Sequence, residues 1–274
     1  MQNIVAFSDS SSVKAAIKTN WENYHYCLGR SPNVELSIGK YLTWLVTDMP
    51  DHFMNLVVCT HLPDEGIAEL IGNALSHFRD LNIRKLSWLA EEGASALELK
   101  KHLTAHGLTF RESFATEMAI DLTSFTSTPP APTGLTIIPV EDDETLKQWI
   151  HVASIGFGVP KDIQDVWFKF FTYAACTLPF RTYLALLNGK PVATSQLFLS
   201  AGVAGIYNVT SLPEARGQGI GTAITSAPLL EAQMMGYHVG ILQASSMGYK
   251  VYQKLGFEDF GKLSVYLWEQ KTDS

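Results

Sequence analysis

The feature that most constrains the fold is a segment near the middle of the chain that has almost nothing to bury. From Thr123 to Gly134 the sequence reads TSFTSTPPAPTG, and its prolines, serines and threonines favour an extended, solvated backbone. Such a segment is typical of a linker. The chain has 274 residues, which is enough for two domains of ordinary size. We therefore predict a first domain over residues 1–122, a linker over 123–134 and a second domain over 135–274.

Composition narrows the class of protein. Hydrophobic residues make up 46% of the chain, and the formal net charge is −7. Proteins that bind nucleic acid need a basic surface, so no nucleic-acid partner is expected. The most apolar stretch, Trp167–Phe180, contains Lys169 and is too short to cross a bilayer, so no membrane association is expected either.

Two further features bear on the compartment. The chain opens with no charged-then-apolar leader. Its three cysteines lie far apart and form no CxxC pair, which favours reduced thiols over disulfides or zinc ligands. These features predict a globular protein of the cytoplasm.

The second domain is expected to combine helices with a mostly antiparallel sheet. Asn188-Gly189 suits the positive φ angles of a tight hairpin turn, and the strand after Gly202 continues a three-stranded meander. The expected strands are Leu135–Val140, Thr182–Leu187, Val192–Leu199, Val203–Thr210, Val239–Gln243 and Leu263–Trp268, and the expected helices are Asp142–Ile155, Lys161–Cys176, one ending near Met235, and Met247–Leu255. The predicted order is β-α-α-β-β-β-α-β-α-β.

The first domain repeats the end of this order. Its expected elements are helix Asp64–Leu81, strand Lys85–Leu89, helix Ser95–His106 and strand Phe110–Leu122. The fragments KKHLTAHGL and YQKLGF fall at matching places in the two copies. Where the second copy reads RGQGIG, however, the first has Leu62-Pro63-Asp64-Glu65-Gly66-Ile67, whose carboxylates would repel an anion.

The segment Arg216-Gly217-Gln218-Gly219-Ile220-Gly221 follows a predicted strand and opens a predicted helix. Its backbone N–H groups and the positive end of the helix converge on one point, as a diphosphate requires, and its glycines permit close approach. A helix start that uses glycine only for a tight turn is the alternative. A dinucleotide fingerprint fits less well, because the spacing is G-x-G-x-G after a meander, and the missing GK[ST] excludes a Walker loop.

Together with the downstream segment, this loop resembles a known family. The stretch VTSLPEARGQGIG, then a helix, a strand and YKVYQKLGF, is similar to the GCN5-related N-acetyltransferase (GNAT) superfamily over about residues 134–268. The resemblance implies an α/β fold with two GNAT-like domains, each a mixed, mostly antiparallel central sheet flanked by helices, arranged as a pseudo-dimer. The first would be a degenerate copy without the CoA pyrophosphate loop, and the second the catalytic domain.

The resemblance also implies acetyl-CoA as cosubstrate, with no metal. In the family the two middle strands splay apart, and the pantetheine pairs with the strand before the loop. The implied cofactor-binding residues are Val209, Thr210, Ser211, Arg216, Gly217, Gln218, Gly219, Ile220, Gly221, Thr222 and Ser245. Ser245 stands where many relatives carry an asparagine that bonds the pantetheine arm.

The chemistry that the resemblance implies is direct attack of an amine on the thioester. The enzyme must hold both reactants, polarise the carbonyl and protonate the departing thiolate. Tyr252 is similar in position to the family's tyrosine acid, and its alternative role is packing on Leu255 and Phe257.

The general base is left open, because no Asp or Glu occurs between Val166 and Pro213. A water held by groups such as Tyr207 or Asn208 is one candidate. The others are side chains that reach in from elsewhere, namely His151, Asp162 and Glu117.

The acceptor is expected to be a small-molecule primary amine. In the family the first two helices wall its pocket, and Phe157, Trp167 and Phe171 would line it here, unless they pack in the core. His102 and His106 lie four residues apart on a helix, but no third metal ligand is near them in the sequence. The predicted protein is an acetyl-CoA-dependent N-acetyltransferase, monomeric or homodimeric. A non-catalytic acyl-CoA sensor and an interaction protein are the alternatives.

Overall fold

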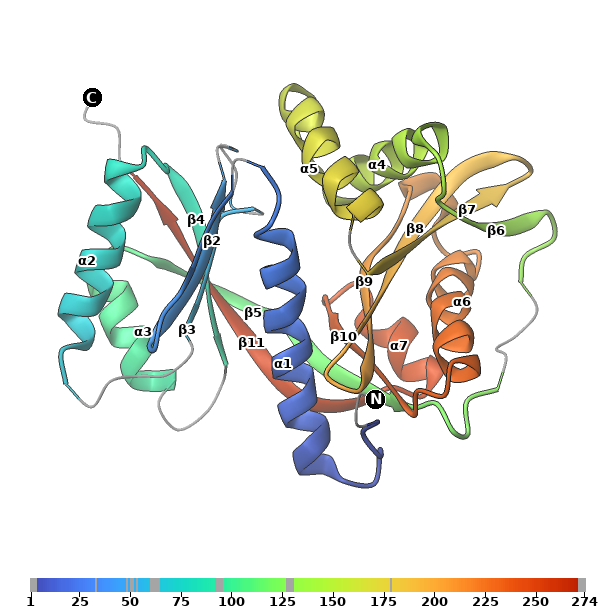
Figure 1. The fold of residues 1–274 in the computed structure, drawn as a ribbon, viewed down its shortest axis with the longest axis horizontal. Coiled ribbons are helices and arrows are strands. Elements are labelled where there is room, and N and C mark those ends of the chain that lie inside the picture. The colour runs from blue at the N-terminus through green and yellow to red at the C-terminus, as the bar shows by residue number, and fades with distance from the viewer. Residues whose placement is uncertain are drawn as a thin grey trace. The chain divides into compact units, whose positions relative to one another are not determined.

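The computed structural model describes residues 4–32, 34–47, 49, 52, 54–59, 65–91, 96–126, 131–177 and 179–270. The chain forms two compact units, and each combines segments that are far apart along the sequence (Figure 1). Unit 1 consists of Met1–Leu28 and Glu117–Phe260, and unit 2 consists of Gly29–Thr116 and Gly261–Ser274. The predicted domains follow the chain, whereas these units do not. Residues 127–130 of the predicted linker lie outside the described residues.

Unit 1 contains the predicted elements of the second domain in the predicted order, except the last strand, whose predicted residues Leu263–Trp268 belong to unit 2. Its strands are β6 (Leu135–Pro139), β7 (Phe180–Leu187), β8 (Lys190–Ser200), β9 (Val203–Ser211) and β10 (Val239–Ala244), and its helices include α4 (Asp143–Phe157), α5 (Gln164–Thr177), α6 (Ile220–Met234) and α7 (Tyr249–Leu255). The strands from β6 to β9 pair antiparallel, and β9 and β10 pair parallel. The β7–β8 turn uses Asn188 (φ 50°) and Gly189 (φ 78°), as predicted.

A helix that the sequence analysis did not predict, α1 (Ser10–Leu28), also belongs to unit 1. It begins where the Asp9 carboxylate accepts hydrogen bonds from the Ser12 N–H (3.1 Å) and the Ser11 hydroxyl (2.7 Å), which caps the first turn. Its buried residues lie three or four positions apart and include Val13, Ile17, Asn20, Tyr24 and Leu28. One face of α1 is therefore inside the protein.

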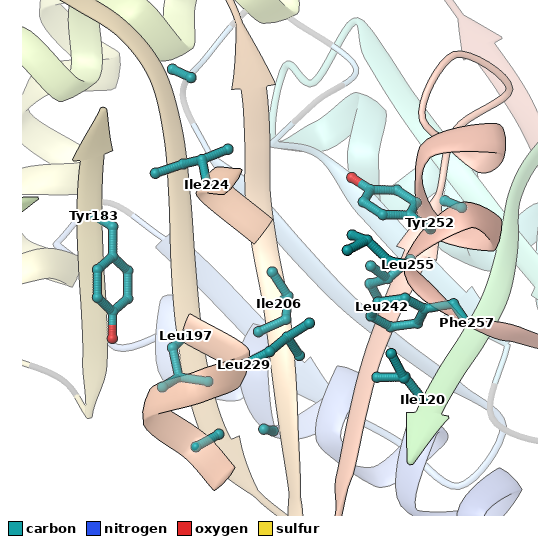
Figure 2. Close-up of a cluster of buried hydrophobic side chains, with 14 of the residues drawn as sticks. Ile120, Tyr183, Leu197, Ile206, Ile224, Leu229, Leu242, Tyr252, Leu255 and Phe257 are labelled. Atoms are coloured by element: carbon teal, nitrogen blue, oxygen red, sulfur yellow. The ribbon is translucent and has the colours of Figure 1, made fainter. Parts of the chain in front are cut away.

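The two faces of the unit 1 sheet are covered by different helices. On one face, Leu197, Ile206 and Leu242 pack against residues of α6 and α7, as Figure 2 shows. On the other face, Val203 and Ile241 pack with Val13 and Ile17 of α1. Neighbouring residues of one strand face opposite sides, so Ile241 faces α1 while Leu242 faces α6 and α7.

Unit 2 repeats this plan on a smaller scale. Its elements are β1 (Val34–Ile38), β2 (Leu42–Thr47), β3 (Leu56–Cys59), α2 (Ile67–Asp80), β4 (Lys85–Glu91) and α3 (Ala96–Ala105). The strands β1, β2 and β3 pair antiparallel, and β3 and β4 pair parallel. The internal repeat thus extends to three strands, β1 to β3, that the sequence analysis did not predict.

Two long strands are divided between the units. Residues 117–121 of β5 (Thr109–Asp121) belong to unit 1, where the Leu122 N–H donates to His238 O at 2.8 Å. Residues Leu263–Glu269 of β11 (Glu258–Glu269) pair antiparallel with β4 in unit 2. The predicted α/β class with mostly antiparallel sheets is confirmed, and the pseudo-dimer arrangement stays a prediction. No helix among the described residues is long and apolar enough to cross a membrane.

Candidate active site

The parallel strands β9 and β10 pair over a short distance and then separate. Their register joins Ala204 to Gly240 and Gly205 to Ile241, whereas β9 continues to Ser211, still paired with β8 on its other edge. Beyond Gly205, the edge of β9 toward β10 therefore has no strand partner in the described part of the chain. Such an edge offers backbone N–H and C=O groups to an extended ligand.

The predicted pantetheine contacts, Val209, Thr210 and Ser211, form the half-buried end of this strand. Just before them, Ser195 of β8 lies opposite two residues of β9, Asn208 and Val209, which is a β-bulge. Asn208 has a positive φ of 52°. The bulge redirects the backbone of β9 at the point where β10 has already left it.

Glycine occupies positions 217, 219 and 221 of the loop before α6 for different physical reasons. Gly217 (φ 74°) and Gly219 (φ 80°) adopt left-handed backbone conformations, which glycine adopts without strain. Gly221 has no such conformation, and a Cβ added there would meet nothing within 4 Å. The internal packing of unit 1 thus does not explain glycine at position 221. Its missing side chain leaves space over the first turn of α6, where backbone N–H groups lack partners within the helix.

Side chains fix the loop and α6 to the sheet. The Arg216 Nε donates to Ser211 O at 3.3 Å, which ties the loop to the end of β9. In α6, Pro228 cannot donate to Ile224 O four residues earlier, and the Ser195 hydroxyl donates to that carbonyl instead, at 2.8 Å. The remaining predicted loop residues, Gln218, Ile220 and Thr222, lie on the exposed loop, in the core and in the half-buried first turn, respectively.

Tyr252 lies on α7, with 8% of its surface exposed. Its ring packs edge-on against Phe257, with centroids 5.8 Å apart, and its hydroxyl points away from Leu255 and Phe257 (Figure 2). No hydrogen bond to this hydroxyl is found within the described part of the chain. Burial raises the pKa of Tyr252 to about 12, so the phenol stays protonated at neutral pH.

Ser245 precedes α7 and is exposed. Its hydroxyl accepts from the Gly248 N–H at 3.3 Å, and its carbonyl accepts from the N–H groups of Gly248 (3.0 Å) and Tyr249 (2.9 Å). These bonds form the turn that starts α7, so Ser245 has a structural role in positioning the helix that carries Tyr252.

Among the side chains considered as general base, Glu117 lies on β5, the strand beside β10 in the sheet. The bond from Leu122 N–H to His238 O, and the contact of a Cβ built at Gly240 with Ile120 (2.9 Å), make β5 and β10 antiparallel neighbours. This register places Glu117 opposite Gln243, on the face that α1 covers. After burial and Tyr24, Glu117 is a further cause of the raised pKa of Tyr207, because a negative charge on Glu117 disfavours a phenolate at Tyr207.

The other two candidates are placed differently. His151 is exposed on α4, and the side chain of Asp162 lies outside what the structure describes. Glu117 is half-buried. In the sheet, β10 lies between β5, which carries Glu117, and β9, which carries Tyr207 and Asn208.

The aromatic residues predicted to line the acceptor pocket differ in exposure. Trp167 (2% exposed) and Phe171 (4%) are buried, with ring centroids 4.8 Å apart. Phe171 also lies 5.4 Å from Trp149 of α4. Phe157 is half-buried at the end of α4, 6.4 Å from Trp167. Among the three, Phe157 presents the most surface.

The histidine pair His102 and His106, which the sequence analysis considered without a third ligand, has other contacts in the structure. His102 Nε2 contacts Glu98 Oε1 at 3.2 Å, and His106 Nδ1 contacts His102 O at 2.8 Å. The described part of the chain contains no group of three His, Cys, Asp or Glu side chains that could hold a metal.

Unit 2 keeps the backbone form of the loop at the start of its equivalent helix. Gly66 (φ 79°) caps α2 as Gly219 (φ 80°) caps α6. The first turn of α2 carries Glu69, whereas that of α6 carries no acidic residue. The preceding segment, residues 60–64, lies outside the described residues. A carboxylate in the first turn disfavours binding of an anion there.

The diverging parallel strands, the glycine-rich helix start and the buried Tyr252 lie within one continuous stretch of the chain, residues 203–252. Residues 179–259 match the family model of the acetyltransferase (GNAT) domain. The chain therefore contains a GNAT domain, which lies within unit 1. The characterised members of this superfamily transfer acyl groups, and the family uses acetyl-CoA.

Solved structures extend the likeness of fold to most of the chain. A GCN5-related N-acetyltransferase from Kribbella flavida has a TM-score of 0.70 at 19% identity, with 94% of this chain and 96% of that chain covered. A tandem GNAT protein from the clavulanic acid biosynthesis pathway has a TM-score of 0.63 at 16% identity, with 98% of each chain covered. A GCN5-related N-acetyltransferase from Sphaerobacter thermophilus has a TM-score of 0.60 at 16% identity, with 96% and 93% covered. No curated protein matches the sequence.

Proposed function

We propose that unit 1 is an N-acetyltransferase that moves an acetyl group from acetyl-CoA to the primary amine of a small molecule by direct attack. The observation that carries this proposal is the combination of an unpaired end of β9 with the open first turn of α6 directly after it in the chain. The first suits an extended amide-containing arm, and the second suits a diphosphate. Coenzyme A contains both.

The proposed cofactor contacts follow from the geometry of the loop. Backbone N–H groups from Gly217 to Thr222 would hold the pyrophosphate at the positive end of the α6 dipole, and Gly221 would leave room for it. The end of β9, from Val209 to Ser211, would pair with the pantetheine arm. Bound acetyl-CoA supplies an activated acyl group, and the chain must orient it, polarise its carbonyl and manage two protons.

Tyr252 would give its proton to the departing sulfur. As the amine nitrogen forms a bond to the carbonyl carbon and the C–S bond breaks, the thiolate takes the phenol proton and the products are an amide and the CoA thiol. The phenol is available for this step because burial keeps it protonated. The same burial would also raise the pKa of a thiol beside it. The difference between the pKa of the phenol, about 12, and that of the CoA thiol, about 8.5 when free, would then be smaller in the site.

Glu117 would take the proton from the attacking amine. Its side chain lies on the α1 face of the sheet, opposite the face on which α7 carries Tyr252. Acid and base would thus act on the thioester from opposite faces of the diverging strands. A carboxylate also attracts an ammonium group, so this arrangement favours an acceptor that arrives as a cation and loses one proton to solvent before the nitrogen attacks.

A charge placed at position 221 tests the cofactor site. Gly221→Glu adds a carboxylate to open space in the first turn of α6 without straining the backbone. Two like charges about 4 Å apart at an effective dielectric constant of about 20 repel by about 4 kcal/mol, so affinity for acetyl-CoA should fall by about 10³-fold. Met234→Glu, at an 80% exposed position at the other end of α6, is the matched control and should leave affinity within about twofold.

Calorimetry on the three proteins measures these affinities. Unchanged binding by folded Gly221→Glu would overturn the proposed site. Release of the CoA thiol with a panel of primary amines then separates an enzyme from a non-catalytic acyl-CoA sensor. A protein that binds no acetyl-CoA at all would be neither.

A further inference from the structure

Asn208 has an unusual backbone conformation for its place in the fold. Four non-glycine residues have a positive φ in the described part of the chain: Asn82, Asn188, Ala201 and Asn208. The first follows the end of α2, and the next two lie in hairpin turns, where this conformation is common. Asn208 instead lies inside β9. Because a side chain in the left-handed region costs free energy, something must hold it there.

Helix α1 provides that support through Tyr24. The Asn208 Nδ2 donates to the Tyr24 hydroxyl at 2.9 Å and to the Gln196 Oε1 at 3.0 Å. The Tyr24 hydroxyl in turn donates to the same Gln196 oxygen at 3.2 Å. The Thr194 hydroxyl holds the other side of the bulge by donating to Asn208 O at 2.8 Å.

Tyr24 itself is firmly held. It is 5% exposed, and its ring stacks on Tyr207 with centroids 4.0 Å apart and planes 14° apart. The neighbouring Asn20 donates to Ser200 O at 2.9 Å and accepts from the Tyr207 hydroxyl at 2.8 Å. Gly205 allows this close approach, since a Cβ there would lie 2.4 Å from Asn20 Oδ1. Asn20, Tyr24 and Gln196 are buried and Asn208 is half-buried, so water competes little for these hydrogen bonds.

We propose that Tyr24 is a positioning residue for acyl transfer: its hydroxyl fixes the Asn208 side chain, and so sets the bulge that aims the backbone of Val209 at the acyl-pantetheine. The inference rests on the proposed function, because it assigns a purpose to the bulge within that site. It also gives the N-terminal helix a part in catalysis, although α1 precedes the GNAT match by about 150 residues. Tyr24 would act through Asn208 and touch neither substrate.

Three variants test this role. Tyr24→Phe removes the hydroxyl and keeps the stacked ring. Asn208→Gly removes the side-chain amide but tolerates the positive φ. Asn23→Ala is the matched control, because Asn23 also joins α1 to the sheet, by donating to the Ser200 hydroxyl at 2.9 Å, but has no bond to the bulge.

The experiment compares acetyl transfer from acetyl-CoA to 2-phenylethylamine in wild type, the three variants and the double variant Tyr24→Phe/Asn208→Gly. Each of Tyr24→Phe and Asn208→Gly should lower kcat about three- to tenfold, the equivalent of one hydrogen bond. The double variant should be no slower than the slower single variant. Affinity for CoA should stay within about twofold in all of them, and Asn23→Ala should keep the wild-type kcat.

Hydrogen exchange of the segment 203–211 gives a second readout that needs no acceptor. It should quicken in Tyr24→Phe and stay unchanged in Asn23→Ala. Multiplicative losses of kcat in the double variant, or an unchanged kcat in Tyr24→Phe, would overturn the proposal. If the wild type binds CoA but acetylates no amine in the panel, the proposed function fails. Hydrogen exchange then decides by itself whether Tyr24 sets the bulge, and unchanged exchange in Tyr24→Phe would refute that role as well.

Discussion

Replacing Tyr252 with Phe removes one oxygen from the proposed site and leaves its packing intact. The ring contact with Phe257 is kept, and no hydrogen bond to the hydroxyl exists in the described part of the chain. We therefore expect the free energy of unfolding near neutral pH to change by less than about 1 kcal/mol. The loss should fall on the chemical step, with kcat lower by about 10²-fold, or about 3 kcal/mol of barrier, and with CoA affinity unchanged.

The dependence on pH follows from the two acids involved. As the pH approaches the thiol's own pKa of about 8.5, the departing thiolate depends less on protonation by Tyr252. The loss of kcat in Tyr252→Phe should therefore become smaller as pH rises.

The stability of the protein should depend on pH through the same hydroxyl. Burial raises the pKa of Tyr252 from 10.0 to about 12, so the folded state holds this proton more tightly than the unfolded chain does. Wild type should lose stability as pH rises from 10 through 12, and Tyr252→Phe should lose less, by about 2–3 kcal/mol.

Gly248→Ala perturbs the same group while keeping its hydroxyl. A Cβ at position 248 would lie 2.8 Å from Tyr252 Cε2, so the ring must move away from its present position. We expect a loss of kcat comparable to that of Tyr252→Phe. Measurement of thiol release for wild type and both variants, at pH values from slightly acidic up to the thiol pKa, together with CoA binding by calorimetry, provides the test. A loss below about threefold in Tyr252→Phe, or one confined to acetyl-CoA binding, would refute the role and leave Tyr252 as a packing residue.

Three further outcomes are expected. Titration with acetyl-CoA should give one site per chain, because α2 carries Glu69 in its first turn where α6 carries no acid; a stoichiometry of two would contradict this. Glu117→Gln should lower kcat by about 10²-fold with CoA affinity retained. A rate equal to that of wild type would mean that Glu117 is not the general base and would favour a bound water in that role. Gly205→Ala should destabilise the protein by about 1–3 kcal/mol in chemical denaturation, since its Cβ would lie 2.4 Å from Asn20 Oδ1 and 2.6 Å from Tyr207 Cε2; an unchanged midpoint would mean that α1 does not pack on β9 as described.

Local signals were sufficient to predict most of unit 1. The Asn188-Gly189 turn, the glycines before α6 and the Gly256 end of α7 (φ 100°) each depend on backbone preferences of one or two residues, which can be read directly from sequence. The pairing of β9 with β10 and their separation were expected from the family resemblance alone, because no local pattern specifies where two strands part.

The helix α1 shows why the remainder could not be predicted. Its inward face includes Asn20 and Tyr24, and polar residues at those positions weaken the apolar periodicity that indicates a buried helix. Their partners, such as Ser200 and Gln196, are more than 170 residues away along the chain. Nothing near α1 in the sequence indicates that those bonds exist. For the same reason Glu117 could be named as a candidate base but not preferred over His151.

The division of β5 and β11 between the units has a consequence for how the protein forms during translation. Unit 2 needs residues 263–269 to pair with β4, and unit 1 needs residues 10–28 to cover its sheet. A ribosome that has made only the first half therefore holds α1 without its sheet, and β4 without one of its neighbours. Such long-range pairing slows folding and leaves strand edges exposed until late. Neither unit can be completed before β11 has been synthesised, so expression of residues 135–274 alone should yield an insoluble or incompletely folded fragment.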